Sequence, residues 1–159
     1  MMHIVLHMPE IPQNTGNIVR TCKVTGSVLH LIKPLGFMID NAKLKRAGLD
    51  YWHEMDIRIH DCWGDFIAGE APGRVWLFTT KAKKLYTEVA FAGSDYLVFG
   101  RETAGLPEDI RNEYPENCLR IPMLGDERSL NLSNAVALSL YEALRQNGFV
   151  IGSGADRLS

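Results

Sequence analysis

One stretch of this sequence joins an apolar run to a polar loop and a helix start: Tyr96-Leu97-Val98-Phe99-Gly100-Arg101-Glu102-Thr103-Ala104-Gly105-Leu106-Pro107. Its four leading apolar residues predict a buried strand, a polar loop bounded by glycines follows, and Pro107 suits the first position of a helix. Ligands of α/β proteins bind at the carboxyl ends of strands, and glycine allows positive φ or a close approach to a bound group. The loop is therefore a candidate ligand site, although a tight structural turn explains it equally well when it is considered alone.

Outward from this stretch, the chain alternates short apolar runs with helical patterns. The apolar runs predict strands over His3–Met8, Val28–Lys33, Met55–His60, Arg74–Thr80, Asp95–Phe99 and Cys118–Pro122. The helical patterns cover Thr15–Thr25, Asn41–Ala47, Asp61–Ala68, Pro107–Tyr114 and Leu132–Gln146. Asn14 is a candidate cap of the first helix, and Gly26 is its expected stop. This alternation predicts one α/β domain over residues 1–151, with a mostly parallel sheet covered by helices on both faces, and a frayed tail over residues 152–159.

The composition is that of an ordinary folded domain and excludes several other classes of protein. The 159 residues are 46% hydrophobic and 23% charged, which argues against disorder, collagen and coiled coil. A formal charge of −2 argues against a purely electrostatic nucleic-acid binder but allows local basic patches. The sequence has no apolar run of membrane-spanning length and no signal-peptide pattern, so we expect a cytoplasmic protein with no membrane partner.

Standard signatures of phosphate, dinucleotide and metal sites are missing from the sequence. Gly100 and Gly105 have the spacing of a Walker loop, but Leu106 and Pro107 follow where Lys and Ser or Thr are required. No G-x-G-x-x-G follows a predicted strand, and no H-E-x-x-H occurs. The three cysteines form no C-x-x-C pair, so we expect reduced and mostly buried thiols. Each of the five histidines is expected to be structural, and no metal site is predicted.

Two further segments carry more polar side chains than their local structure requires. Residues 9–20 form a stiff loop that leads into a helix, and Arg20 lies near that helix N-terminus, where the macrodipole disfavours a cation. A surface arginine paired with a carboxylate is the alternative explanation. Residues 120–134 leave a strand and enter a helix through Ser129, Asn131, Ser133 and Asn134. Simple capping is the alternative there, but four such groups exceed what one helix end needs.

Together, the three segments resemble the three motifs of the SPOUT superfamily of S-adenosylmethionine-dependent RNA methyltransferases. The resemblance rests on Asn14–Arg20, on Phe99–Pro107, and on Ile121–Met123 with Ser129–Ala135, in the family's order. Within the superfamily, the chain is most similar to short single-domain enzymes that 2′-O-methylate the wobble nucleotide 34, a cytidine or modified uridine, of certain tRNA-Leu species. The segments 45–52 and 79–81 resemble that subgroup, whereas Arg101 and the spacer 124–127 depart from it.

The resemblance implies a fold, a cofactor site and a homodimer. In this superfamily the C-terminal part of the sheet is threaded into a deep trefoil knot, and each active site lies at the interface of two subunits. The resemblance places S-adenosylmethionine, with no metal, against Phe78, Gly100, Glu102, Ile121, Ser129, Leu130 and Asn134. The implied catalytic residues are Arg20, Asn14, Glu102, Ser129 and Asn131. We expect Arg20 to clamp a phosphate or a developing alkoxide rather than act as a base, because a guanidinium stays protonated in proteins.

The expected substrate, a tRNA, requires basic residues that contact phosphates. The candidates are Arg20, Lys23, Lys43, Lys45, Arg46 and Lys81, although solvated surface explains each cluster equally well. The broad apolar surface of the helix Leu132–Gln146 fits either a well-buried helix or one that packs on a second subunit, and a dimer favours the second interpretation. The alternative functions are 2′-O-methylation of another tRNA or ribosomal RNA nucleotide, a non-catalytic RNA or nucleotide-binding module, and a flavodoxin-like nucleotide binder, which leaves the three segments unexplained.

Overall fold

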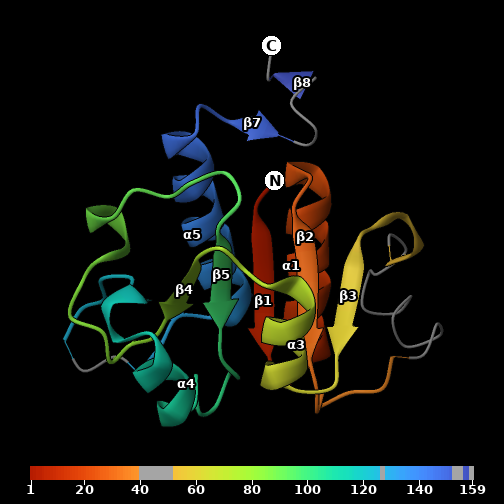
Figure 1. Cartoon of the computed structure of the whole chain (residues 1–159), viewed down its shortest axis with the longest axis horizontal. Helices are drawn as coiled ribbons and strands as arrows, with labels where there is room; N and C mark the ends of the chain where they lie inside the picture. The colour runs from red at the N-terminus through yellow and green to blue at the C-terminus, as the bar shows by residue number, and fades with distance from the viewer. Residues whose placement is uncertain (40–51, 126–127, 152–155, 158–159) are drawn as a thin grey trace.

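A six-stranded, all-parallel sheet forms the centre of the molecule, in the order β3-β2-β1-β5-β4-β6 (Figure 1). The computed structural model describes residues 1–39, 52–125, 128–151 and 156–157. The strands of the sheet are β1 (His3–His7), β2 (Val28–Ile32), β3 (Ile57–His60), β4 (Val75–Phe78), β5 (Tyr96–Phe99) and β6 (Cys118–Leu119). The structure thus confirms the prediction of a single α/β domain built on a parallel sheet.

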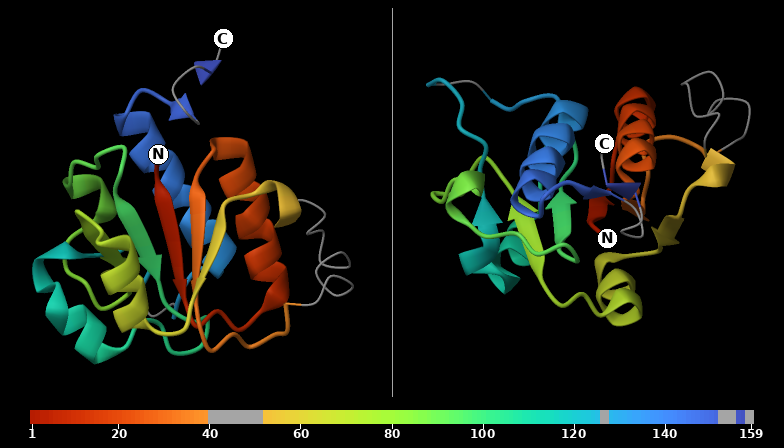
Figure 2. Two further views of the ribbon diagram at one scale, coloured as in Figure 1. Left: turned by 45° about the vertical axis from the view of Figure 1, so that its right-hand side comes forward. Right: turned by 90° about the horizontal axis from the view of Figure 1, so that it is seen from above.

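Helices cover both faces of the sheet, as the alternating pattern predicted. Helices α1 (Pro12–Thr25) and α5 (Leu132–Gln146) lie side by side on one face, and α3 (Trp63–Glu70) and α4 (Glu108–Glu113) lie on the other (Figure 2). Short 3₁₀ turns occur at Trp52–Glu54, Tyr86–Glu88 and Pro115–Asn117. Among the described residues, no helix combines the length and the apolarity that crossing a bilayer demands.

Two apolar clusters, one on each face, explain why the strands are nearly continuous apolar runs. In β1, Ile4 and Leu6 pack in the cluster under α1 and α5, whereas Val5 packs in the cluster under α3 and α4. A parallel sheet that is covered on both faces requires apolar residues at every position of its central strands. All six predicted strands exist, but each is shorter than predicted. β1, for example, ends at His7 because Met8 adopts φ 54°, which turns the chain out of the sheet.

The first helix corrects one prediction and confirms another. α1 begins at Pro12 rather than at Thr15, and its N-cap is Ile11, which offers no side-chain acceptor. Proline at the first helical position has its φ already set and lacks an N–H that would be unsatisfied there. Asn14 is therefore wrong as the cap and instead lies, buried, in the first turn. The helix stops at Gly26, which has φ 63° as expected.

Helices α3 and α4 start later than predicted, whereas α5 does not. α3 begins at Trp63, and the Sγ atom of its N-cap residue Cys62 accepts a hydrogen bond from the Asp65 N–H. Cys62 is exposed, so the expectation of mostly buried thiols is wrong for it; Cys22 is buried and Cys118 is half-buried. α4 begins one residue after Pro107, and α5 has the predicted bounds. The predicted helix over Asn41–Ala47 lies outside the described residues.

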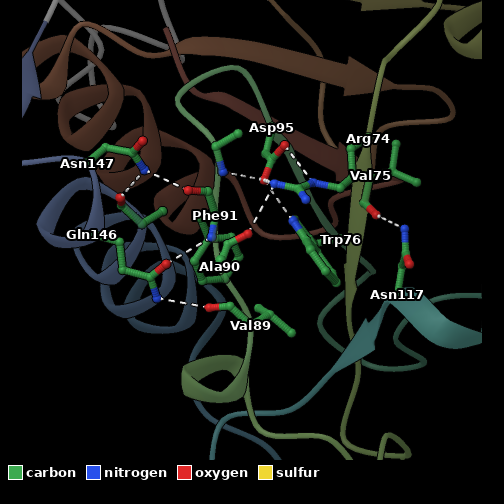
Figure 3. Close-up of polar contacts among 12 residues, drawn as sticks. Arg74, Val75, Trp76, Val89, Ala90, Phe91, Asp95, Asn117, Gln146 and Asn147 are labelled. Carbon is green, nitrogen blue, oxygen red and sulfur yellow. Dashed lines mark hydrogen bonds and ion pairs between the residues drawn. The ribbon is translucent and has the colours of Figure 1, made fainter.

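A hydrogen-bonded network fastens the amino ends of β4 and β5 to the rest of the fold (Figure 3). The buried Asp95 carboxylate accepts hydrogen bonds from the Arg74 guanidinium at 2.9 and 2.7 Å, from the Trp76 indole at 2.9 Å and from the Ala92 N–H at 2.8 Å. A buried charge is tolerated when it is paired and hydrogen-bonded in this way. At the end of α5, Gln146 and Asn147 bond the main chain between residues 89 and 91. The polar side chains at the amino ends of β4 and β5 are therefore used in holding the fold together.

The end of the chain contains a small element that was not predicted. β7 (Val150–Ile151) and β8 (Asp156–Arg157) pair as an antiparallel two-stranded ribbon. Asp156 and Arg157 belong to the segment that the sequence analysis expected to be frayed.

Candidate functional site

The carboxyl ends of β4, β5 and β6 surround a cavity of about 610 Å³. The loops that follow these strands and the first turn of α5 line it, including Phe78, Thr79, Lys81, Phe99, Gly100, Arg101, Glu102, Thr103, Ile121, Met123, Arg128, Ser129, Leu130 and Leu132. Of the predicted cofactor-binding residues, Asn134 alone is outside this lining as the structure describes it; it is exposed on the first turn of α5. The sequence prediction of a ligand site at strand ends therefore corresponds to a real cavity.

One wall of the cavity is apolar and flat. The rings of Phe78 and Phe99, at the ends of the neighbouring strands β4 and β5, are stacked with centroids 4.7 Å apart. Ile121, Leu130 and Leu132 add aliphatic surface from the other two segments. This wall suits a planar or aliphatic part of a ligand, while the polar loops around it offer hydrogen-bonding groups.

The two ends of the loop after β5 approach each other closely, and this explains why residue 100 is a glycine. A Cβ atom on Gly100 would lie 2.0 Å from the Gly105 carbonyl carbon and 2.2 Å from the Leu106 nitrogen, so only glycine fits. Gly105 adopts φ 66°, and its N–H donates to the Arg101 carbonyl at 2.9 Å. Both glycines are thus required by the loop's own backbone, and that backbone forms one side of the cavity.

A chain of hydrogen bonds joins the three motif segments. The Glu102 carboxylate, in the loop after β5, accepts from the Asn14 side-chain amide at 3.2 Å. The side-chain oxygen Oδ1 of Asn14 in turn accepts a hydrogen bond from the side-chain amide nitrogen of Asn131, at the start of α5, at 2.9 Å. Three residues from separate parts of the sequence therefore meet beside the cavity, and Asn14 is the link between the other two.

Glu102 also binds the residues just before α1, and Glu10 in turn binds the residue after Glu102. Its carboxylate accepts from the main-chain N–H groups of Glu10 at 2.8 Å and Ile11 at 3.0 Å, immediately before the helix. The Glu10 carboxylate accepts from both the N–H and the hydroxyl of Thr103 at about 3.0 Å. Several N–H donors hold the Glu102 carboxylate in one orientation, so Glu102 is a positioning group in this structure.

The start of α5 combines capping with contacts to the cavity. Asn131 is the N-cap, and its Oδ1 accepts from the N–H groups of Ser133 at 2.9 Å and Asn134 at 3.4 Å. Its amide nitrogen simultaneously makes the bond to Asn14. The hydroxyl of Ser129 lines the cavity and has no hydrogen bond among the described residues. Capping alone therefore explains Asn134 and part of Asn131, but it does not explain Ser129.

The predicted RNA-binding residues fall into three groups. Arg20 is exposed on α1, outside the cavity lining of the described chain, and no hydrogen bond or ion pair involves it there. Lys23 is paired with Glu54, whereas Lys81 is exposed at the rim of the cavity. Lys43, Lys45 and Arg46 lie outside the described residues.

Two arginines of the cavity were not among the site residues predicted from the sequence. Arg101 and Arg128 both line it, and the buried Arg101 Nε atom has no hydrogen-bond partner in the described chain. The nearby His7 shows the influence of that cation, because burial lowers the pKa of His7 and the charge of Arg101 lowers it further. Both residues lie in polar segments singled out from the sequence, Arg101 within residues 96–107 and Arg128 within residues 120–134, and Arg101 is a position where the chain departs from the family resemblance.

The comparison with known families agrees with this arrangement. A model of the SpoU rRNA Methylase family matches residues 1–141, which include all three motif segments. The chain belongs to this family. The SpoU-family relatives include a protein of Saccharophagus degradans named tRNA (cytidine(34)-2′-O)-methyltransferase, which is 53% identical over 150 residues, 94% of this chain and 97% of the relative.

Solved structures of SpoU-type enzymes extend the comparison to three dimensions. A structure described as giving insights into the 2-OH methylation of C/U34 on tRNA is 47% identical, with a TM-score of 0.86 over 92% of this chain and 96% of that one. The SpoU methyltransferase AviRb of Streptomyces viridochromogenes, in complex with the cofactor AdoMet, is 25% identical, with a TM-score of 0.77 over 91% of this chain and 60% of that one. The resemblance to RNA methyltransferases that the motifs indicated is therefore confirmed at the level of the family.

Proposed function

We propose that this chain transfers a methyl group from S-adenosylmethionine to the ribose 2′-hydroxyl of nucleotide 34, a cytidine or modified uridine, in the anticodon loop of tRNA, with tRNA-Leu as the expected substrate. The observation that carries the proposal is the meeting of the three motif segments at one cavity through Glu102, Asn14 and Asn131. The names of the similar proteins support the substrate and the position.

The cavity suits S-adenosylmethionine in size and chemistry. Its volume of about 610 Å³ lies within the usual range of ligand pockets. Phe78, Ile121 and Leu130 offer apolar contacts, while main-chain groups of the loop that begins at Gly100 can bind the adenine edge. Ser129, whose hydroxyl makes no hydrogen bond among the described residues, and the polar start of α5 near Asn134 are available to the rest of the molecule. When bound, the sulfonium would supply the methyl group and leave as the neutral thioether, while the proton of the ribose hydroxyl is released to water, so the proposed reaction needs no metal.

The protein's contribution to this reaction is alignment and electrostatic stabilisation. The ribose hydroxyl must be held in line with the methyl group, and such positioning supplies several kcal/mol of the barrier, up to about 7–11. Asn14, Glu102 and Asn131 hold the loops in register, so we assign them a positioning role. Arg20 is the group that clamps a phosphate or the developing alkoxide through its planar donors.

The exposed position of Arg20 supports an active site shared by two subunits. Arg20 does not line the described cavity of its own chain, as expected if it serves the cavity of a second copy. α1 and α5 pack side by side and carry exposed apolar residues, namely Val24 on α1 and Leu138 and Tyr141 on α5. A surface of this kind fits a homodimer interface, which agrees with the dimer interpretation of the last helix.

The other parts of the proposal follow from the same resemblance. Phosphates of the tRNA would contact Arg20, Lys23 and Lys81, and Lys43, Lys45 and Arg46 remain predictions. We also propose the trefoil knot of the family for the C-terminal part of the sheet, on the resemblance alone. A tRNA substrate is consistent with the expected cytoplasmic location.

Mixed dimers provide the test of the shared site. The Arg20→Ala chain keeps an intact cavity, and a Leu130→Arg chain has a blocked cavity but an intact Arg20. We expect each variant alone to be inactive on tRNA transcripts and the mixed dimer to recover activity at one of its two sites. Failure of the mixture, with both chains dimeric, would contradict the shared site.

Calorimetric titration of the wild-type chain with S-adenosylmethionine tests the cofactor separately. Binding without transfer to any tRNA transcript would indicate a non-catalytic binding module. Transfer to a ribosomal RNA fragment or to another tRNA nucleotide, with none at nucleotide 34, would retain the enzyme class and overturn the substrate. Mapping the 2′-O-methyl group in the product distinguishes these outcomes.

A further inference from the structure

Three histidines form a row across the face of the sheet that α3 covers. The Nδ1 atom of His3 on β1 lies 2.9 Å from Nε2 of His30 on β2, and Nδ1 of His30 lies 3.1 Å from Nε2 of His60 on β3. Glu70, the last residue of α3, completes the group, which we call the histidine cluster. No residue of the histidine cluster is part of the described cavity lining, so the proposed methyl transfer does not account for it.

Three atoms of the histidine cluster have the spacing of ligands around one metal ion. Oε1 of Glu70 lies 3.8 Å from Nδ1 of His30 and 3.9 Å from Nε2 of His60, and the two nitrogens are 3.1 Å apart. A point equidistant from these three atoms lies about 2.1 Å from each of them, which is the length of a zinc bond to imidazole nitrogen or carboxylate oxygen. Two imidazoles and one carboxylate are also a ligand set that zinc uses.

The burial of the imidazoles agrees with this geometry. Burial, together with the charges of the neighbouring His3 and His60, lowers the pKa of His30 to about 3. Burial also lowers the pKa of His60 below its usual value. Burial thus favours the neutral imidazole, which is the form that a metal ligand must offer.

The atoms behind these ligands are satisfied in the way that metal sites require. The second nitrogen of His30 is bonded to His3, which fixes the orientation of its ring. Oε2 of Glu70 accepts from the Arg58 guanidinium at 2.7 Å, and Arg58 is held in turn by two bonds to Asp56. Outer contacts of this kind orient metal ligands. The carboxylates of Glu70 and Asp56 and the guanidinium of Arg58 together carry one net negative charge, which favours binding of a cation.

We propose that His30, His60 and Glu70 bind one divalent transition-metal ion, zinc above all, with water in the remaining coordination position. The side chains of His60 and Glu70 are 11% and 13% exposed, so the site can be reached from solvent. Its ligands come from β2, β3 and the end of α3, and the ion would therefore fasten this helix to the edge of the sheet. The site is separate from the proposed methyl transfer.

Cobalt binding to the full chain tests the proposal. A chelator first removes bound metal, and the chelator is then removed by dialysis. The metal-free chain is titrated with Co²⁺, and Zn²⁺ is added afterwards as a competitor. We expect one equivalent of Co²⁺ to produce the intense visible bands of a four- or five-coordinate ion, one equivalent of Zn²⁺ to remove them, and Zn²⁺ to raise the unfolding temperature.

Variants of the two partly exposed ligands identify the site. His60→Gln and Glu70→Gln should each lower the Co²⁺ affinity at least tenfold, since even outer contacts of metal sites contribute about 10- to 100-fold. The matched control is Cys62→Ser, which removes an exposed thiol two residues from His60 and should leave the affinity unchanged. Circular dichroism and the unfolding midpoint confirm that each variant is folded.

Three results would overturn the proposal. The first is the absence of visible bands at one equivalent of Co²⁺ in the wild-type chain, which would show that the three histidines form a hydrogen-bonded row without a metal. The second is a Co²⁺ affinity that Cys62→Ser abolishes. The third is an affinity that survives in both folded ligand variants. X-ray absorption of the Zn²⁺-loaded wild-type chain gives the number of imidazole ligands and does not depend on a variant that folds.

Discussion

The cavity edge at β4, β5 and β6 and the histidine cluster under α3 are two polar sites on one sheet, and they are assembled in opposite ways. The cavity is built from loops, so Gly100, Arg101, Glu102 and Thr103 reach it as one continuous stretch of sequence. The histidine cluster takes single residues from three strands and a helix end, 27 and 30 positions apart between successive histidines.

The comparison shows which kind of site can be recognised from a sequence motif. Loops at strand ends carry neighbouring residues to the same place, so their chemistry is visible as a motif. A site on the face of a sheet depends on register, because a slip of one residue sends a side chain to the opposite face. In β2 and β3, His30 is paired with Arg58 and Ile32 with His60, and this register alone puts the histidines on one diagonal. The following predictions test whether the cavity edge serves the reaction and the histidine cluster serves stability.

The largest expected effect is that of Arg20→Ala on methyl transfer. Loss of a group that stabilises developing charge lowers the rate by about 10²- to 10³-fold or more, whereas S-adenosylmethionine should still bind because Arg20 is outside the cavity lining. Single-turnover transfer to a tRNA transcript and calorimetry measure the two quantities. Arg20→Lys is the matched variant, and it should recover part of the rate if charge rather than the planar fork matters. Near-normal turnover of Arg20→Ala would remove this residue from the mechanism.

Gly100→Ala should have the next largest effect, and on both fold and cavity. The added Cβ atom would overlap the backbone at Gly105, so we expect the free energy of unfolding to fall by about 3 kcal/mol and cofactor binding to be lost. Denaturant unfolding and calorimetry measure these changes. Gly73→Ala is the control, because no atom of the described part of the chain lies within 4 Å of the position its Cβ would occupy. Equal stabilities of the two variants would mean that the loop adapts to a side chain.

The histidine cluster should make stability depend on pH. The pKa of His30 falls from 6.5 to about 3 on folding because of burial, so the unfolded chain takes up a proton first as the pH decreases. The free energy of unfolding in the presence of a chelator should therefore decline below about pH 6.5, by up to about 1.4 kcal/mol per pH unit for this group. Denaturant unfolding between about pH 7 and pH 5 measures the slope.

The pH dependence also separates the two regions. His60→Gln removes a second imidazole whose pKa is lowered by burial, so it should reduce the slope while leaving methyl transfer at neutral pH unchanged. A stability that stays flat between these pH values would show that the imidazoles of the folded chain are protonated as easily as those of the unfolded chain.

The smallest expected effect is that of Lys81→Ala on tRNA binding. Removal of one phosphate contact at the rim of the cavity should weaken binding modestly and reduce the slope of log affinity against log salt by about one. Binding measured over a series of salt concentrations gives the slope. Lys33→Ala is the matched control, because Lys33 is exposed but already paired with Asp61. The same slope for all three proteins would exclude Lys81 from phosphate contact.

Much of the fold was predictable because its signals are local. The apolar runs that became β1, β2 and β5 are buried on both faces, and burial of that kind leaves a continuous pattern in the sequence. Helix ends were less predictable, since the N-cap of α1 is the apolar Ile11, and the carboxylate that accepts the Ile11 N–H belongs to Glu102, 91 residues later in the chain. When the acceptor comes from a distant loop, the residues next to the helix in the sequence do not indicate where the helix starts.

By itself, the sequence determined the order of strands and helices, the glycine-bounded loop after β5 and the three motif segments, because each of these depends on residues that are neighbours in the chain. Only the tertiary structure decided that Asn14 joins Glu102 to Asn131 rather than capping a helix, and that His30, His60 and Glu70 share one point in space. These arrangements arise from strand register and from the packing of α1, α3 and α5 on the sheet. Contacts between distant residues form only when those elements come together.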